Sequence, residues 1–451
     1  MNALTQYLDL YREHAGLIDS NSAPAMNALR PEAAAILKDT TLPKADYGIY
    51  QNCDLSGMLA PDYGLNIARI DIDVNPAATF HCDVPKLGGE PFVVTNDIVN
   101  PSSPALLPEG VYAGSMREFA QKNPDLFASF YGKAAAMDNP IVALDTMLVQ
   151  DGFLLYIPKG LKIEKPLQLV NILQNGAPLM AVRRLLIILE EEAEAKLLVC
   201  DHTQNPQVDF LALETVEIFA DRNSRFDYYA LEESSALTHR ISALYCDQKQ
   251  GSKVVINGMT LYNGTTRNEY YCRLKEPDAE LHLLGLGIED EKRRVSSYSR
   301  ISHDAPHCKS DELFRFTADD EARAAFIGRI FVAPGAVGTE AYQSNRNLLG
   351  SDTARIESMP ELEIYNDDVK CSHGSAVGQL DPLQLFYMRT RGISEDTARL
   401  LLKQAFMADI IDGIAVETLR DRLHILVERR FSGASSACAS CAGCNGHREH
   451  E

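Results

Sequence analysis

The sequence predicts a mainly β protein, in which a β-helix (solenoid) core lies between an N-terminal and a C-terminal α-helical region. Three observations predict this class. Strand-like runs follow one another from about residue 141 to about residue 375 without a long amphipathic helix, their starts are regularly spaced, and helical apolar patterns are confined to the two ends. The length of 451 residues allows two to four structural units, and an apolar fraction of 45% excludes global disorder.

The N-terminal region, residues 1–140, is predicted to be helical at first and mixed afterwards. The first forty residues read as helix, and they include a second helical stretch over residues 23–37 that Pro31 should kink or split. A short strand is expected at residues 92–94 and a helix over residues 115–131. This region shows none of the regular strand spacing that follows it.

Residues 141–380 are predicted to form the solenoid core. The runs rich in aliphatic, β-branched and aromatic residues are 147–149, 153–157, 167–173, 197–199, 215–219 and 254–256. No amphipathic helix of useful length separates them, so the crossover helices of an α/β fold are not expected.

The starts of the strands repeat at two related intervals. A polar turn and then a small or β-branched residue precede many of them. The interval is 29, 28 and 27 residues between the markers Ala195, Ser224, Ser252 and Ala279, and 15, 17 and 15 residues between the markers Ala322, Val337, Ala354 and Val369. The longer interval is close to twice the shorter, as is typical of a β-helix whose rungs stack about 4.8 Å apart. A large sandwich or barrel with regular strands is the alternative.

The C-terminal region, residues 381–433, is predicted to contain three helices. Asp381 is a candidate N-cap for the first, which should end at Gly392, and Ser394 is a candidate N-cap for the second. The apolar stripe of the second helix is expected to consist of Ala398, Leu401, Leu402, Ala405, Phe406 and Ile410. The cysteine-rich tail, residues 434–451, is expected to be disordered because it contains few large apolar residues.

Composition and missing motifs exclude several functions. The net charge of −20 argues against a nucleic-acid partner. The chain shows no secretory signal and no apolar run long enough to cross a membrane, so a cytoplasmic protein with reduced thiols is expected. Phosphate-loop, GxSxG and HExxH motifs are absent, and the Gly285-Leu286-Gly287 run lacks the third glycine of a dinucleotide fingerprint. We therefore expect no bound nucleotide and no ATP hydrolysis by this chain alone.

Two clusters inside the predicted core carry metal-ligand types. Residues 303–311 bring together two histidines, a thiol and two carboxylates, which can bind a metal but also suit a polar turn between rungs, the preferred interpretation. Within residues 366–374, a strand would place Val369, Cys371 and His373 on one face. An imidazole and a thiolate on one face can share a metal, whereas the structural alternative is a packed cysteine beside a hydrogen-bonded histidine.

A third cluster lies in the tail. Cys438, Cys441 and Cys444 are spaced as in CxxC pairs, with His447 and His450 nearby. Such pairs need a second, folded pair of ligands to make a closed site, so adventitious metal or oxidation is the preferred interpretation and a specific metal site is the alternative.

A long segment of the chain resembles a known family. HDAPHCKSDELF and AYQSNRNLLGSDTARIESMPELEIYNDDVKCSHGSAVGQLDPLQLFYMRTRGIS, both within residues 303–425, are similar to the SufB/SufD family, the scaffolds of the SUF iron–sulfur cluster assembly system. Weaker similarity covers about residues 1–433. SufB carries a functional cysteine near the segment that matches AYQSNRNLL, where this chain reads Ser344-Asn345-Arg346-Asn347, so the resemblance is to the SufD branch.

The resemblance implies a fold, partners and a site. The fold is a right-handed parallel β-helix, and the partners are SufB, in a heterodimer, and two copies of the ATPase SufC. His373 matches the family histidine implicated in building a transient iron–sulfur cluster at the SufB interface, and Cys371 shares its strand face. The C-terminal helical region is implied to dock SufC, with Leu385, Phe386, Arg389, Arg391, Leu402 and Phe406 as candidate contacts.

Two other functions are weighed against this one. A β-helix carbohydrate-active enzyme is disfavoured because the chain lacks a secretory signal and has no tryptophan to stack on sugars. A homodimeric scaffold that acts without SufC is the second alternative, and a homodimer of the isolated protein is compatible with either scaffold role.

Overall fold

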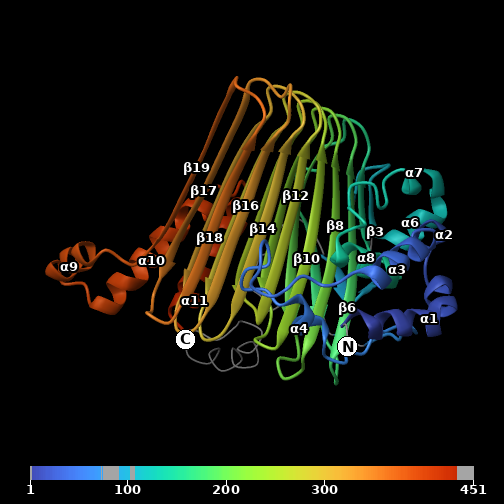
Figure 1. Ribbon diagram of the computed structural model, residues 1–451, viewed down its shortest axis with the longest axis horizontal. Helices are drawn as coiled ribbons and strands as arrows, with labels where there is room; N and C mark the ends of the chain where they lie inside the picture. Colours follow the sequence, from blue (N-terminus) through green and yellow to red (C-terminus); the bar gives the residue numbers. More distant parts are fainter. Residues whose placement is uncertain (1–2, 73, 75–90, 102–106, 434–451) are drawn as a thin grey trace, which may run out of the picture.

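The structure, a computed structural model, describes residues 3–72, 74, 91–101 and 107–433 (Figure 1). Its centre is a parallel β-solenoid of about eight turns, and helices lie at both ends of the chain. Each turn contributes one strand to each of two facing sheets, so consecutive long strands alternate between the sheets. The prediction of a mainly β solenoid is confirmed, and the sandwich or barrel alternative is wrong because neighbouring long strands are parallel.

The first sheet, called sheet 1, has ten strands, which include all the odd-numbered long ones. They are β1 (Phe92–Thr95), β2 (Ile98–Val99), β5 (Leu167–Leu173), β7 (Glu194–Thr203), β9 (Arg225–Glu233), β11 (Lys253–Tyr262), β13 (Glu280–Glu289), β15 (Lys309–Ala318), β17 (Thr339–Leu349) and β19 (Val369–Gly378). The order is β19-β17-β15-β13-β11-β9-β7-β5-β1-β2, so β19 forms one edge.

The second sheet, called sheet 2, has nine strands. They are β3 (Tyr112–Ser115), β4 (Phe153–Ile157), β6 (Leu179–Leu189), β8 (Phe210–Ala220), β10 (Thr238–Gln248), β12 (Thr265–Leu274), β14 (Arg294–His303), β16 (Arg323–Val332) and β18 (Arg355–Ile364). The order is β18-β16-β14-β12-β10-β8-β6-β4-β3, so β18 forms the edge next to β19.

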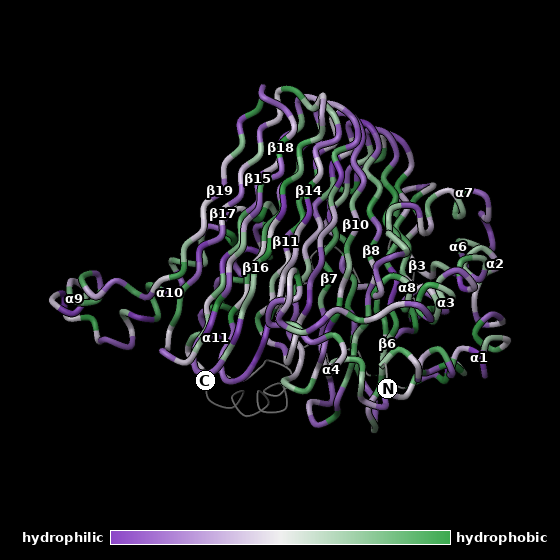
Figure 2. Tube along the Cα trace, viewed as in Figure 1, coloured by the Kyte–Doolittle hydropathy of each residue, from purple (hydrophilic) through white to green (hydrophobic). Residues whose placement is uncertain are grey.

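The two sequence intervals correspond to a full turn and a half turn of the solenoid. The markers of the longer interval lie at or beside the starts of β7, β9, β11 and β13, all in sheet 1. Those of the shorter interval lie at or near the starts of β16 to β19, which alternate between the sheets. Hydrophobic and hydrophilic positions alternate along many strands, since successive side chains point into and out of the solenoid (Figure 2).

Close packing inside the solenoid explains the Gly285-Leu286-Gly287 run. The two glycines lie on β13 beside Phe314 and Phe316 of β15, their register partners. A β-carbon on either glycine would collide with the neighbouring phenylalanine ring. The glycines therefore make room for the aromatic core and give no support to a dinucleotide site.

Most of the described helices pack against the outer faces of the two sheets. The N-terminal group is α1 (Leu4–Ser20), α2 (Pro24–Asn27), α3 (Arg30–Asp39), α4 (Leu55–Leu59), α6 (Met116–Lys122), α7 (Pro124–Ala128) and α8 (Pro140–Leu148). Together with outward residues of sheet 2, such as Leu186 and Leu213, this group forms one apolar cluster. The C-terminal group is α9 (Pro382–Thr390), α10 (Glu395–Ile411) and α11 (Glu417–Phe431). Helices α10 and α11 form a second cluster with sheet 1.

Two predicted elements differ from the structure. The expected strand at residues 147–149 is wrong: its first two residues end α8, which begins at Pro140 after the side-chain N-cap Asn139. An apolar run in a helix that is buried on all sides cannot be told from a strand by periodicity. The helix expected over residues 115–131 is broken between α6 and α7, because proline at 124 cannot donate a backbone hydrogen bond. The stretch over residues 23–37 is split into α2 and α3 as predicted, and Pro31 lies in the first turn of α3.

Within the described ranges, no helix is both long and apolar enough to cross a membrane.

Candidate functional site at the open end of the solenoid

The solenoid ends differently on its two sides. At the start of the chain, β2 pairs antiparallel with β1, and β3 pairs antiparallel with β4, so the growing edges are terminated by reversed strands. At the other side, β18 and β19 are the last strands of their sheets, and no described strand pairs with their outer edges. We call this side, formed by β18 and β19, the open end. Its free backbone groups are a template for pairing with another chain.

Strand β19 places Cys371 and His373 on the face directed toward the solenoid interior. Cys371 is the register partner of the buried Ala341, and His373 is that of the buried Gln343. Cys371 is half-buried among the apolar residues near Ile330 and Val332, and burial raises the pKa of its thiol. Its neutral form is therefore favoured in the isolated chain.

The imidazole of His373 has a different environment. The residue is exposed, because no further turn of the solenoid covers it. Within the described part of the chain, it forms no hydrogen bond or ion pair. An exposed, unpartnered imidazole on an inward face is free to take a metal or a partner group.

Part of the interior next to the open end is polar. Gln343, Asn345 and Asn347 point inward from β17 and are buried. Gln343 Nε2 donates to the Glu312 carboxylate at 2.6 Å, and Asn345 Nδ2 donates to the Phe314 carbonyl at 3.2 Å. Sequence reasoning missed this group, although its inward positions follow from the two-residue period of the strand.

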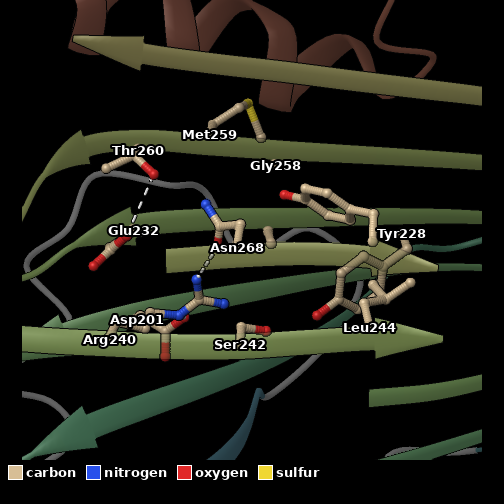
Figure 3. A pocket seen from close by; sticks show the side chains of 12 residues that line it. Asp201, Tyr228, Glu232, Arg240, Ser242, Leu244, Gly258, Met259, Thr260 and Asn268 are labelled. Atoms are coloured by element: carbon tan, nitrogen blue, oxygen red, sulfur yellow. Dashed lines mark hydrogen bonds and ion pairs between the residues drawn. The ribbon is translucent and has the colours of Figure 1, made fainter. Parts of the chain in front are cut away.

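A second internal polar cluster lies deeper in the solenoid (Figure 3). The Arg240 guanidinium donates to Asn268 at 2.7 Å and to Glu214 at 3.1 Å, and it lies 3.3 Å from Asp201. Glu232 accepts from Thr266 at 2.9 Å, and burial raises the pKa of Glu232 to about 7. The residues around Arg240 line a cavity of about 20 Å³, room for a single water. We interpret this buried network of ion pairs and hydrogen bonds as structural. It was not predicted from the sequence.

The cluster at residues 303–311 forms a polar turn between β14 and β15. His303 is buried, its Nε2 lies 2.9 Å from Ser310 Oγ, and burial lowers its pKa to about 4. His307 occupies a turn position with φ of 59°, and the Cys308 thiol donates to the Glu276 carbonyl at 3.3 Å. No group of three or more metal ligands gathers anywhere in the described ranges. The structure therefore supports the turn interpretation.

Helix α9 stands away from the solenoid at the open end (Figure 1). The predicted N-cap is confirmed, since the Asp381 carboxylate accepts from the backbone of Leu383, and the helix ends before Gly392, whose φ is +85°. Leu383, Phe386 and Tyr387 are exposed by 76%, 66% and 59%, an unusual concentration of large apolar side chains in nine residues.

The other candidate contacts in the C-terminal region differ in how far they are buried. Leu385 is buried and Leu402 is half-buried, whereas Arg389 pairs with Glu395 at 3.3 Å. Arg391 lies over the Tyr387 ring, 5.2 Å from its centroid. Both arginines belong to the exposed surface around α9.

Helix α10 packs on sheet 1 with a stripe that differs from the predicted one. Ser394 caps the helix as predicted, but the buried residues are Ala398, Met407, Ile410 and Ile411. Leu401 is 42% exposed, and Phe406 is partly buried with the Arg315 guanidinium over its ring. Arg315 also pairs with Asp409 at 2.5 Å, which joins α10 to β15.

The tail cysteines Cys438, Cys441 and Cys444 lie outside the described residues, as does the whole of the stretch over residues 434–451.

Comparisons with known proteins identify the family. The model of the SufBD core domain of the SUF system for iron–sulfur cluster assembly matches residues 172–406, and the model of the SufBD N-terminal region matches residues 1–169. A SufBD family iron–sulfur cluster assembly protein of Synechocystis is 28% identical over 89% of this chain and 90% of its own length.

Two proteins named SufD are also similar. The iron–sulfur cluster assembly protein SufD of Escherichia coli is 28% identical over 62% of this chain and 66% of its own length. SufD of Bacillus subtilis is 26% identical over 73% of this chain and 76% of its own length. The chain belongs to the SufBD family of the SUF iron–sulfur cluster assembly system, and the resemblance seen in the sequence is confirmed at that level.

Proposed function

We propose that this chain is the SufD-type scaffold subunit of a cytoplasmic SUF assembly complex. Its open end pairs with SufB, its C-terminal helical region binds SufC, and a transient iron–sulfur cluster is assembled at the SufB interface beside His373 and Cys371. The observation that carries the proposal is the open end itself, where two strand edges and an inward-facing imidazole are left without partners among the described residues.

A homologous solenoid is the partner that best fits the open end. Strands β18 and β19 present parallel-sheet edges side by side, and a second solenoid end has the same spacing and twist. Such pairing would cover the partly exposed apolar residues near the edge, including Leu362 and Val369. It would also bring residues of the partner over His373.

The cluster site is incomplete in this chain alone. Cys371 and His373 supply one soft and one borderline donor, while iron–sulfur clusters are held mainly by thiolates and sometimes by histidine. The remaining ligands would come from SufB. Iron and sulfide are the cargo of this site, so a transient cluster is compatible with only two donors from this subunit.

The exposed face of α9 is the proposed SufC contact. Leu383, Phe386 and Tyr387 supply apolar area, and Arg389 and Arg391 supply a charged rim. This composition is that of an interface core with its rim. SufC would then supply ATP hydrolysis, and this chain would neither bind nucleotide nor act as an enzyme.

Measurement of molar mass in solution tests the proposal. The isolated chain is expected to form at most a homodimer through its open end, to form a heterodimer when SufB is added, and to take up two SufC subunits in the SufB complex. A chain that remains a homodimer in the presence of SufB and SufC would support the homodimeric scaffold instead. Phe386→Asp on the exposed face of α9 should abolish the SufC contribution of this subunit.

A further inference from the structure

One inward column of sheet 1 changes from apolar to polar toward the open end. Each member is the register partner of the next: Leu167, Leu197, Tyr228, Ile256, Leu283, Glu312, Gln343 and His373. The first five belong to the apolar core of the solenoid. The last three are polar and occupy the three strands nearest the open end, so the column leads from the core to His373.

Gln343 is held at its amide nitrogen and is unsatisfied at its amide oxygen. Nε2 donates to the Glu312 carboxylate at 2.6 Å, and both residues are buried. Gln343 Oε1 is buried, and it has no hydrogen-bond partner among the described residues. A buried acceptor without a donor destabilises a fold, so its position next to His373 needs an explanation.

A glycine on the opposite sheet leaves room for this amide. Gly328 lies on β16 of sheet 2, and a β-carbon there would collide with Gln343 Nε2. The Gln343 side chain therefore reaches across the interior to Gly328, while Glu312 binds its nitrogen from the neighbouring strand. With Nε2 fixed on that side, Oε1 is the free atom of the amide.

His373 is the next member of the column beyond Gln343. Register partners on neighbouring strands lie about 4.8 Å apart, within reach of a hydrogen bond between their side chains. A histidine that binds metal through one ring nitrogen usually donates the N–H of the other to an oxygen acceptor, which sets the tautomer and the orientation of the ring.

We propose that Gln343, anchored by Glu312, is a positioning residue for His373. Its Oε1 accepts the N–H of one ring nitrogen when a partner covers the open end, and the other ring nitrogen is thereby left with its lone pair available to iron. The inference rests on the proposed function, because it assumes that His373 contacts the cluster or its iron. It adds two residues, Gln343 and Glu312, that shape how the imidazole does so.

The test compares iron loading and ring chemistry in the complex with SufB and SufC. The variants are Gln343→Met, which keeps the length of the side chain and removes the amide, Glu312→Gln, which keeps an acceptor for Gln343, and His373→Ala. Asn345→Leu is the matched control, since Asn345 is buried on the same face of β17 but is in register with Ser375. The probes are ferrous iron and sulfide. The ring nitrogen chemical shifts of ¹⁵N-labelled histidine in the sedimented complex report the tautomer of His373.

Gln343→Met is expected to weaken iron binding about ten- to a hundredfold and to mix the two tautomers of His373. Glu312→Gln still accepts from Gln343 Nε2, and Asn345 is in register with Ser375, so both variants should load iron close to wild type. Gln343→Leu provides a second variant if Gln343→Met does not assemble.

Three results would overturn the inference. Normal loading and an unchanged tautomer in Gln343→Met, while His373→Ala fails to load, would leave the proposed site intact and remove the role of Gln343. Normal loading in both variants would remove the proposed site and this inference together. An equal loss in Asn345→Leu would show that the effect is general disorder of the open end.

Discussion

The two ends of the solenoid differ in how the edges of their sheets are covered. At the start of the chain, reversed strands and the N-terminal helices terminate the sheets, and α8 lies buried against sheet 2 with ion pairs from Arg184 to Asp145 and Glu217. At the other side, β18 and β19 have free edges among the described strands, and one inward column beside them is polar at Glu312, Gln343 and His373, where the earlier turns are apolar. The closed end is covered by this chain itself, and the open end is the surface that we propose binds a partner.

This difference distinguishes residues that stabilise the fold from residues that belong to the proposed interface. Substitutions at the closed end should change the free energy of unfolding. The molecules that still fold should assemble with their partners as the wild type does. Substitutions at the open end should change assembly or loading and leave unfolding nearly unchanged. The following predictions test that separation, from the largest expected effect to the smallest.

Arg184→Met should give the largest loss of stability. The guanidinium is fully buried, 2.9 Å from Asp145 and 2.7 Å from Glu217, so its removal leaves two buried carboxylates without their cation. Breaking a buried pair in this way costs about 3–5 kcal/mol, measurable by urea unfolding. Arg346→Met on β17, where the side chain is exposed, should change stability by less than about 0.5 kcal/mol. Similar losses in the two variants would contradict the contrast between the ends.

Glu289→Gln should change the pH dependence of stability. Burial raises the pKa of Glu289 to about 8, above its ordinary value of 4.5. The folded state then holds a proton that the unfolded state releases, so stability is fully present below pH 4.5 and is lost as the pH rises through 8. The variant has no such proton, and relative to wild type it should gain roughly 1 kcal/mol per pH unit across that window.

A control of opposite sign is available at the open end. Lys370 holds the pKa of the Glu340 carboxylate below its ordinary value, so its stabilisation is present at neutral pH and lost as the pH falls. Glu340→Gln should therefore differ from wild type mainly at neutral pH and only slightly. Urea unfolding of the three proteins between pH 3 and pH 8 checks both signs, because the loss at Glu340 occurs below its ordinary pKa of 4.5. A flat difference between Glu289→Gln and wild type would contradict the first prediction.

Phe406→Ala and Phe386→Ala should separate folding from SufC binding. Phe406 is partly buried beneath Arg315, so its loss should cost about 2 kcal/mol, less than the 3–5 kcal/mol of a fully buried phenylalanine. Phe386 is 66% exposed, so its loss should leave unfolding unchanged and weaken SufC binding about tenfold or more, as at an interface hot spot. Calorimetric titration with SufC gives the affinities. An unchanged affinity of Phe386→Ala for SufC would refute the α9 contact.

Much of the fold could be predicted from the sequence because the solenoid repeats. Each turn uses the same polar turn and the same alternation along the strand, so the intervals between Ala195, Ser224, Ser252 and Ala279 report a full turn directly. Helix α8 could not be recognised, since burial on all sides removes the amphipathic period that distinguishes a helix. Its start at Asn139-Pro140 was the available signal.

The candidate site could be predicted only in part. A two-residue period was enough to place Cys371 and His373 on one face. Their position on the last strand, and the polar column of Glu312 and Gln343 beneath them, depend on the register between strands about thirty residues apart. That register is a tertiary property. A polar residue in a strand, such as Gln343, is normally expected to point to solvent, so its type does not predict an inward side chain.

Cluster loading of the His373→Ala complex tests the central claim most directly. The claim is that the open end serves assembly of the cluster and that the fold does not depend on it. The variant should match wild type in thermal unfolding and in its association with SufB and SufC, because His373 is exposed and unpartnered within the described residues. Its iron and sulfide content after loading should fall sharply. A well-assembled variant that loads clusters like wild type would contradict the claim, as would a variant that fails to fold.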